Sequence, residues 1–264
     1  MTGYIELSYF DLLLASVLLL FNAGLSLALG LRLERQMLLA ALRMTVQLLL
    51  VGLVLQALFA TVSLWLTALV ALIMALFAGR EILSRQERRL KGWWGYGIGS
   101  ATMLLAGMVV TVLALNGPLR PEPWYDPRYA IPLFGMILGN AMTGISLGLD
   151  GLTSLVGRER AAIEAQLTLG ATRWRALRPI AQRALRTGFT PMLNSMAAAG
   201  VVFLPGMMTG QILSGVAPEQ AVKYQILVLF LIAGASGLGV LTAVLASIWR
   251  LTDDRHRLRL DRLT

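Results

Sequence analysis

Long apolar segments separated by short polar ones make up most of this chain of 264 residues. A helix needs about 20 apolar residues to cross the roughly 30 Å hydrocarbon core of a bilayer. The run Met44–Phe77 is long enough for two such helices, joined by a turn near residues 60–63. We therefore predict an all-α integral membrane protein with about seven transmembrane helices: Tyr9–Leu29, the two halves of Met44–Phe77, Tyr96–Leu115, Ile131–Leu149, Met192–Leu213 and Tyr224–Trp249.

The sixth predicted span contains the helix-breaking pair Pro205-Gly206. Proline removes a backbone hydrogen bond and glycine permits a turn, so we expect the helix to kink or break there. In transporters, the backbone groups freed by a broken helix face protein or a water-filled cavity. The break therefore marks a candidate site on a substrate path.

The basic residues predict the orientation of the spans, because cytoplasmic loops of membrane proteins retain an excess of lysine and arginine. If the N-terminus is outside, all of the 23 basic residues except Arg120, Arg128 and Lys223 fall on the inner side. We therefore predict an N-out, C-in topology, with a single transmembrane domain covering residues 1–264.

Composition supports a membrane protein and narrows its chemistry. Hydrophobic residues make up 57% of the chain and charged residues 14%, against about 45–50% and about 25% in soluble domains. The net charge of +9 is explained by arginines on the cytoplasmic side, so we expect no nucleic-acid partner. The chain has no cysteine, and its single histidine, His256, stands in a charged tail. Disulfides, thiolate metal sites and histidine-rich metal sites are therefore excluded.

The sequence also argues against several kinds of active membrane protein. No acidic residue falls at mid-membrane depth, where a proton-coupled carrier needs one. No buried Ser/His/Asp set suggests an intramembrane hydrolase. A phosphate-binding loop needs Gly-Lys-Ser/Thr, and the only lysines follow Leu90 and Val222. We expect a transport subunit that is not an enzyme and binds no cofactor, with ATP and Mg²⁺ on a separate ATPase.

The largest inner loop, residues 156–188, has the pattern of a basic helical hairpin. Its first helix is expected to end at Gly170, and Thr172 suits the N-cap of the second. Glycine at the break is expected to let the two short helices cross closely. The second helix has arginines on one side and an apolar stripe on the other, formed by Trp174, Leu177, Ala181, Ala184 and Leu185.

Two functions fit this hairpin. Its arginines can hold a juxtamembrane helix to anionic lipid headgroups. Alternatively, the hairpin can dock in a groove of an ATPase, because a Glu-Ala pair followed by glycine has the spacing of the coupling helix in many ABC-transporter permeases. We favour docking, since the chain lacks an ATPase of its own. The predicted contact residues are Glu164, Ala165, Gly170, Arg173 and Trp174.

Several motifs make the comparison with permeases more specific. Leu204–Gln211 reads Leu-Pro-Gly-Met-Met-Thr-Gly-Gln, and further motifs are Ala41–Leu48, Gly139–Met142, Glu164–Trp174, Pro191–Met196 and Tyr224-Gln225. Together these stretches resemble the FetB family, the permeases of the bacterial FetAB-type ABC transporter, and the resemblance covers most of the chain. It implies a multi-pass permease of the bacterial inner membrane that works with a FetA-like cytoplasmic ATPase. Iron export is the reported role of the family.

Polar side chains and sulfur atoms within the predicted spans outline a candidate substrate path: Gln47, Asn140, Asn194, Met207, Met208 and Gln211. The alternative is packing, because thioethers fill gaps and amides form interhelical hydrogen bonds worth about 0.6 kcal/mol each. Small residues four apart are likewise typical of close helix packing. These pairs are Gly135/Gly139, Gly144/Gly148 and Gly206/Gly210.

Met207 and Met208 are the candidate metal ligands on this path. Fe²⁺ sites usually offer carboxylate, imidazole or thiolate groups, and the predicted spans hold none of these at depth. A metal would therefore pass with transient contacts, or it would travel as a complex, or the substrate is of another kind.

We predict the permease subunit of an ABC transporter, working as a homodimer and moving iron or another metal outward. The alternative is an ATPase-independent channel or a scaffold that binds membrane lipid through its arginine loops. Only the permease should retain a stoichiometric ATPase.

Overall fold

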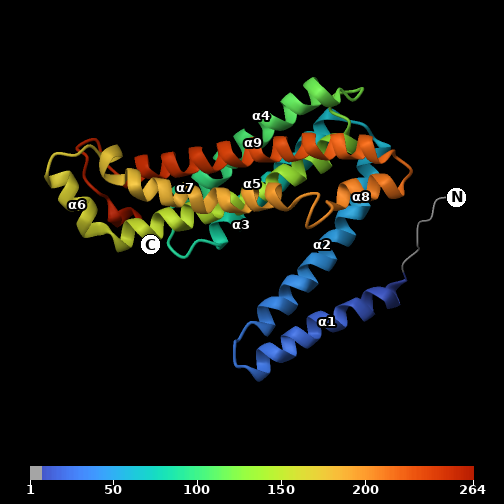
Figure 1. The fold of residues 1–264 in the computed structure, drawn as a ribbon, viewed down its shortest axis with the longest axis horizontal. Coiled ribbons are helices and arrows are strands. Elements are labelled where there is room, and N and C mark those ends of the chain that lie inside the picture. The colour runs from blue at the N-terminus through green and yellow to red at the C-terminus, as the bar shows by residue number, and fades with distance from the viewer. Residues whose placement is uncertain (1–7) are drawn as a thin grey trace. The chain divides into compact units, whose positions relative to one another are not determined.

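The computed structural model describes residues 8–264. The described residues form two compact units, residues 8–62 with 213–215 and residues 63–212 with 216–264. The helices of the smaller unit are α1 (Tyr9–Ala28) and α2 (Glu34–Ala60). The others (Figure 1) are α3 (Leu64–Ser84), α4 (Trp93–Ala114), the π-helical turn η1 (Leu115–Leu119), α5 (Pro127–Arg158), α6 (Arg160–Thr168), α7 (Arg173–Ala198), α8 (Gly206–Leu213), α9 (Pro218–Leu251) and the 3-10 turn η2 (Leu260–Arg262).

The smaller unit is a helical hairpin whose ends are fixed by local hydrogen bonds. At the start of α1, the Ser8 N–H donates to Asp11 Oδ2 at 2.8 Å and Ser8 Oγ accepts from the Asp11 N–H at 3.3 Å. This reciprocal pair is a capping box. At the turn, Ser26 Oγ accepts from the Leu33 N–H and donates to Glu34 Oε2, both at 3.0 Å. The end of α1 is thereby tied to the start of α2.

In the larger unit, α5 lies at the centre and packs against α3, α4, α7 and α9. Its buried side chains Ile145 and Leu152 belong to one continuous core with Leu177 of α7 and Ile248 of α9. A second cluster near the start of α5 joins Val110 of α4 and Val228 of α9 with Leu115, Leu133 and Ile137. The core therefore runs along most of the length of α5.

Glycines allow α5, α7 and α9 to approach one another closely. A Cβ added at Gly144 would lie 2.8 Å from the carbonyl oxygen of Gly188, and one added at Gly188 would lie 2.6 Å from Val240 Cγ1. Gly148 also lies in this crossing, so the packing role predicted for Gly144/Gly148 is confirmed. No such contact within the chain is found at Gly139, Gly206 or Gly210, because no atom of another segment lies within 4 Å of a Cβ added there.

Among the described residues, six helices are long and apolar enough to span a membrane: α1, α2, α3, α4 with η1, α5 and α9. The turn predicted near residues 60–63 is confirmed between α2 and α3. The break predicted within the span Met192–Leu213 is confirmed, but it is longer than expected, because α7 ends at Ala198 and α8 begins at Gly206. The two helices follow each other along the larger unit, from the end that carries α6 toward the end where α9 begins (Figure 1).

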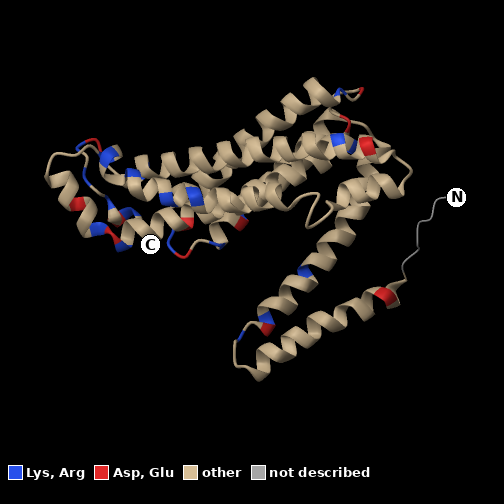
Figure 2. Cartoon of the chain, in the orientation of Figure 1, with Lys and Arg blue, Asp and Glu red and all other residues tan. Residues whose placement is uncertain are grey.

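Charged residues are concentrated at the ends of the larger unit, and the stretch between them is almost free of charge (Figure 2). The richer end carries α6, the beginning of α7, the α3–α4 connection and the C-terminal tail. A band of uncharged side chains between two charged ends is the arrangement that a bilayer requires, because charges at its centre are costly.

Reporter fusions test the predicted orientation of this arrangement. We expect a reporter fused after Thr264 to be cytoplasmic and one inserted near Glu122 to be external, because the basic residues are concentrated around the C-terminal tail. Phosphatase and fluorescent-protein fusions measured in the same cells would distinguish the two sides. Finding both reporters on one side would contradict an odd number of crossings between them.

Candidate coupling hairpin and helix-break cavity

The hairpin between α5 and α7 has strong local signals for its turn. Thr172 Oγ1 accepts a hydrogen bond from the Arg175 N–H at 3.4 Å, which confirms Thr172 as the N-cap of α7. Gly170 has a φ of +86°, and its N–H donates to the Leu167 carbonyl at 3.0 Å. The Ala171 N–H donates to the Gln166 carbonyl at 3.0 Å. These two bonds form a Schellman motif, which requires a left-handed residue at the position of Gly170.

The expected reason for glycine at this position was wrong. No atom of another segment lies within 4 Å of a Cβ added at Gly170. Glycine is therefore required by the positive φ of the turn rather than by a close approach of α6 to α7. The predicted break itself is confirmed, because α6 ends at Thr168 and α7 begins at Arg173.

Ion pairs hold the hairpin in shape. Arg183 of α7 donates to Glu159, between α5 and α6, at 2.6 Å, and this hydrogen bond lowers the pKa of the Glu159 carboxyl below its ordinary value. Arg160 pairs with Glu164 at 2.8 Å along α6. The carboxylate of Glu164 remains partly exposed, so it is accessible to a partner protein.

The tip of the hairpin presents apolar side chains to the outside of the chain. Leu169 is 87% exposed and Trp174 is 44% exposed, and Ala165 is also exposed. Trp174, the first residue of the predicted apolar stripe, stays exposed, because burial on α7 begins only at Ala176. The rest of the stripe is buried or half-buried, and Ile180 joins it.

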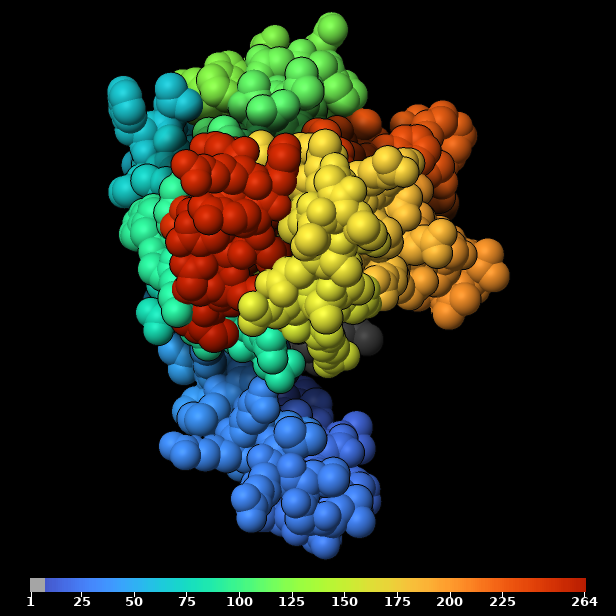
Figure 3. All heavy atoms as spheres, turned by 90° about the vertical axis from the view of Figure 1, so that its left-hand side faces the viewer, coloured from blue at the N-terminus to red at the C-terminus, as the bar shows by residue number. Residues whose placement is uncertain are grey.

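The C-terminal tail lies against the hairpin, a contact that the sequence did not predict (Figure 3). Its His256 Nδ1 accepts a hydrogen bond from the Arg173 N–H at 3.4 Å. The end of the tail pairs with the α3–α4 connection, where the Lys91 N–H donates to the Arg262 carbonyl at 2.8 Å and the Thr264 N–H to the Arg89 carbonyl at 2.9 Å. The tail therefore joins the hairpin and the α3–α4 connection into one surface.

A second candidate site lies at the break between α7 and α8. The pair Pro205-Gly206 stands at the end of the break, as predicted, but the non-helical segment begins seven residues before Gly206, at Ala199. Gly200, with a φ of +83°, donates its N–H to the Phe203 carbonyl at 2.9 Å. The segment closes one side of a cavity of about 510 Å³.

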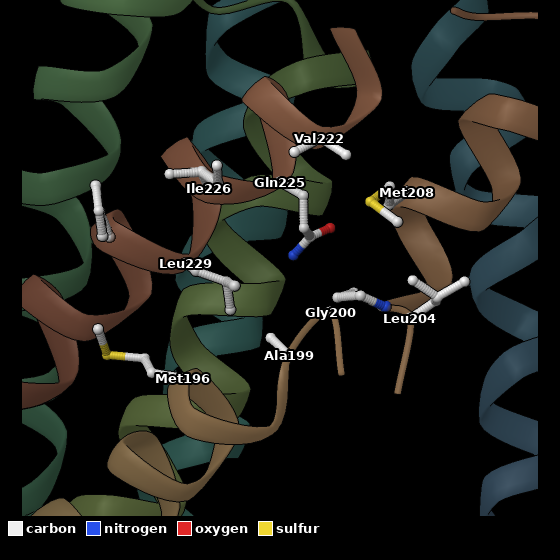
Figure 4. Close-up of a pocket in the computed structure, with 11 residues that line it drawn as sticks. Met196, Ala199, Gly200, Leu204, Met208, Val222, Gln225, Ile226 and Leu229 are labelled. Carbon is white, nitrogen blue, oxygen red and sulfur yellow. The ribbon is translucent and has the colours of Figure 1, made fainter. Parts of the chain in front are cut away.

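The cavity is half open and is lined by the end of α7, residues 199–205, α8 and the first half of α9 (Figure 4). Its lining is apolar except for the side-chain amide of Gln225 on α9. Gln225 is 7% exposed, and its Oε1 is buried without a hydrogen-bond partner. Gln225 was not among the predicted path residues, although a glutamine inside the last predicted span is itself a signal.

Of the predicted path residues, the structure places only Met208 in the lining of this cavity. Met207 points elsewhere and packs against the cluster around Val110 and Val228. Gln211 is half-buried, and its Oε1 lacks a hydrogen-bond partner. Asn140 and Asn194 are exposed on α5 and α7. Gln47 lies on α2, in the smaller unit.

Metal-binding groups are scarce throughout the described part of the chain. Residues 8–264 contain no group of three histidine, cysteine or carboxylate side chains that could hold a metal ion. Among the side chains that line the cavity, only the thioethers of Met196 and Met208 and the amide of Gln225 could contact a metal ion. Met207 and Met208, the predicted ligands, face different surroundings.

Comparison with known proteins places this architecture among membrane proteins. Residues 9–251 match the model of the "Uncharacterised protein family (UPF0014)". The chain is 32% identical to the "UPF0014 membrane protein YjkA" of Bacillus subtilis over 92% of this chain and 93% of that protein. It is 35% identical to the "Probable iron export permease protein FetB" of Escherichia coli over 58% of each chain. It is 33% identical to the "Protein ALUMINUM SENSITIVE 3" of Arabidopsis thaliana over 65% of this chain and 61% of that protein. No solved structure matches.

Proposed function

We propose that this chain, which belongs to the UPF0014 family, is the permease subunit of an ATP-driven transporter in a bacterial inner membrane. The resemblance to the FetB family is confirmed by the match to a protein that bears that name. The family match and the long apolar helices of the structure both indicate a multi-pass membrane protein. The proposal adds the energy source, the partner and the direction of transport.

The observation that carries the proposal is the exposed, capped hairpin at the charged end of the larger unit. The Schellman motif at Gly170 and the Glu159–Arg183 pair fix its shape, while Leu169 and Trp174 remain uncovered. Exposed apolar side chains rimmed by charges are typical of a protein interaction site. A cytoplasmic ATPase with a matching groove is the partner that fits a permease without a phosphate-binding loop of its own.

We further propose that the permease works as a homodimer. Asn140 and Asn194 are exposed on helices that cross at Gly144 and Gly188. Both lie beyond the crossing, toward the end of the helices that is far from the hairpin, because α7 runs antiparallel to α5. Amide groups facing lipid at this depth are unfavourable, whereas a second copy of the chain offers them hydrogen-bond partners. The name of the Escherichia coli relative favours export of iron or another metal as the task of the complex.

Purification and transport in vesicles test the proposal together. We expect the tagged full-length chain, extracted with mild detergent, to retain a stoichiometric ATPase subunit. We expect inside-out vesicles containing both proteins to accumulate one member of a panel of Fe²⁺, Mn²⁺, Zn²⁺ and Al³⁺ only when ATP is supplied. Metal movement that needs no ATP, with no ATPase retained, would instead indicate a channel. Anionic-lipid binding without transport would indicate a lipid-binding scaffold.

A further inference from the structure

We propose that the cavity between the α7–α8 break and α9 binds an uncharged, mainly apolar organic molecule that carries a hydroxyl group. This proposal rests on the proposed function, because it names the class of substrate that a permease of this kind would take at this site. The ligand is neutral and is held by apolar contacts and one hydrogen bond; it is not a bare metal ion.

The walls of the cavity fit an apolar ligand of moderate size. Its volume of about 510 Å³ falls within the roughly 300–1,000 Å³ of ordinary small-molecule sites. Leu204 and Met208 line it on the side of the break, and Ile226 and Leu229 line it on α9. Such a lining gains free energy by removing apolar ligand surface from water.

Gln225 provides the specific contact. Its side chain is directed into the cavity, toward Met208 and Gly200 (Figure 4). A buried amide oxygen without a partner is unfavourable, and a donor group on a ligand would satisfy it. Because the rest of the lining is apolar, one hydroxyl group at this point is enough to orient a ligand. A hydroxyl both donates and accepts, so it suits either end of the amide.

The same lining disfavours a bare divalent cation. Fe²⁺ would have to lose its hydration shell in exchange for the thioethers of Met196 and Met208 and one neutral amide. The lining residues include no carboxylate, imidazole or thiolate to replace the lost water or to balance the charge. A metal ion would therefore enter this cavity only inside a neutral, lipophilic complex.

Photolabelling of the purified full-length chain, without any ATPase, tests this assignment. The probes are a matched pair, trifluoromethyl-phenyl-diazirine and its para-hydroxymethyl derivative, and labelled peptides are mapped by mass spectrometry. We expect the hydroxymethyl probe to label the peptides around Met208 and Leu229 saturably. In Gln225→Leu, the half-saturation concentration of the hydroxymethyl probe should rise about tenfold, the effect of one lost hydrogen bond. The parent probe without the hydroxymethyl group should label as before.

Two further variants and one metal measurement complete the experiment. Gln220→Leu changes an exposed glutamine of the same helix and should leave labelling by both probes unchanged. Ala199→Phe fills the cavity from the break and should exclude both probes, even if Gln225→Leu does not fold. Equal labelling of the wild type and Gln225→Leu by the hydroxymethyl probe would overturn the proposal. So would saturable binding of Fe²⁺ alone that is lost in Gln225→Leu.

The outcomes separate this proposal from the permease assignment. If the cavity is not labelled but ATP-driven transport is found, only the ligand class is wrong. If the hydroxymethyl probe binds as expected but no ATPase is retained, the cavity stands and the permease assignment fails.

Discussion

Gly188→Val is expected to abolish stable folding of the larger unit. A Cβ at Gly188 would lie 2.6 Å from Val240 Cγ1 of α9 and 2.9 Å from the Gly144 carbonyl oxygen of α5. Two of the three helices in this crossing would have to move, and the second contact is with backbone, which has no rotamer to change. Overpacking a core costs about 1–3 kcal/mol, and we expect Gly188→Ala to fall in this range and valine to exceed it.

Unfolding of the detergent-purified protein by SDS or heat measures this effect. Gly234→Val is the matched control, because it is a helical glycine of α9 with no atom of another segment within 4 Å of an added Cβ. It should change the unfolding midpoint little. Combining Gly188→Ala with Val240→Ala should recover part of the lost stability, since Val240 is the nearest obstacle. A stable Gly188→Val protein would contradict the observed crossing.

The two halves of this helix crossing differed in how well the sequence predicted them. Gly144 and Gly148 were identified because their spacing places both on one face of a helix. Gly188, which meets them, is the only glycine of α7, and its small partner four residues earlier is Ala184, a pair that was not identified. Gly206 and Gly210 have the same spacing as Gly144 and Gly148, but no atom of another segment lies within 4 Å of a Cβ added at either position. Spacing therefore shows which residues share a helix face, while the partner of that face depends on tertiary structure.

The candidate sites show the same division between local and long-range information. The turn at Gly170 and Thr172 was predictable because a positive φ and an N-cap are properties of a few adjacent residues. The cavity was not, since Gln225 and Met208 are brought together only when α9 packs beside the break. The Pro205-Gly206 break was predicted, but nothing in the pattern indicated that the helix would already end at Ala198. The contact of His256 with Arg173 likewise joins segments 83 residues apart.

Gly170→Val is expected to disconnect ATP hydrolysis from transport while leaving the protein inserted in the membrane. Valine at a φ of +86° is strained, and strain of this kind costs roughly 1–3 kcal/mol. No neighbouring atom obstructs the side chain, so the strain comes from the backbone angle φ alone. A change in the conformation of the turn relieves it. The Schellman hydrogen bonds would be lost and the angle between α6 and α7 would change. The core beneath α7, which begins at Ala176, would remain intact.

An altered hairpin changes how the proposed ATPase contact transmits movement. A coupling free energy reduced by about 1–3 kcal/mol corresponds to a loss of coupling of about 5- to 150-fold. We therefore expect ATP-dependent transport in vesicles to fall at least about fivefold. ATP hydrolysis should persist but no longer respond to substrate. Gly170→Asn is the matched control, because asparagine tolerates the left-handed conformation that valine does not, and it should retain most of the transport. Substrate-stimulated ATP hydrolysis and transport at wild-type levels in Gly170→Val would show that this turn does not carry the coupling.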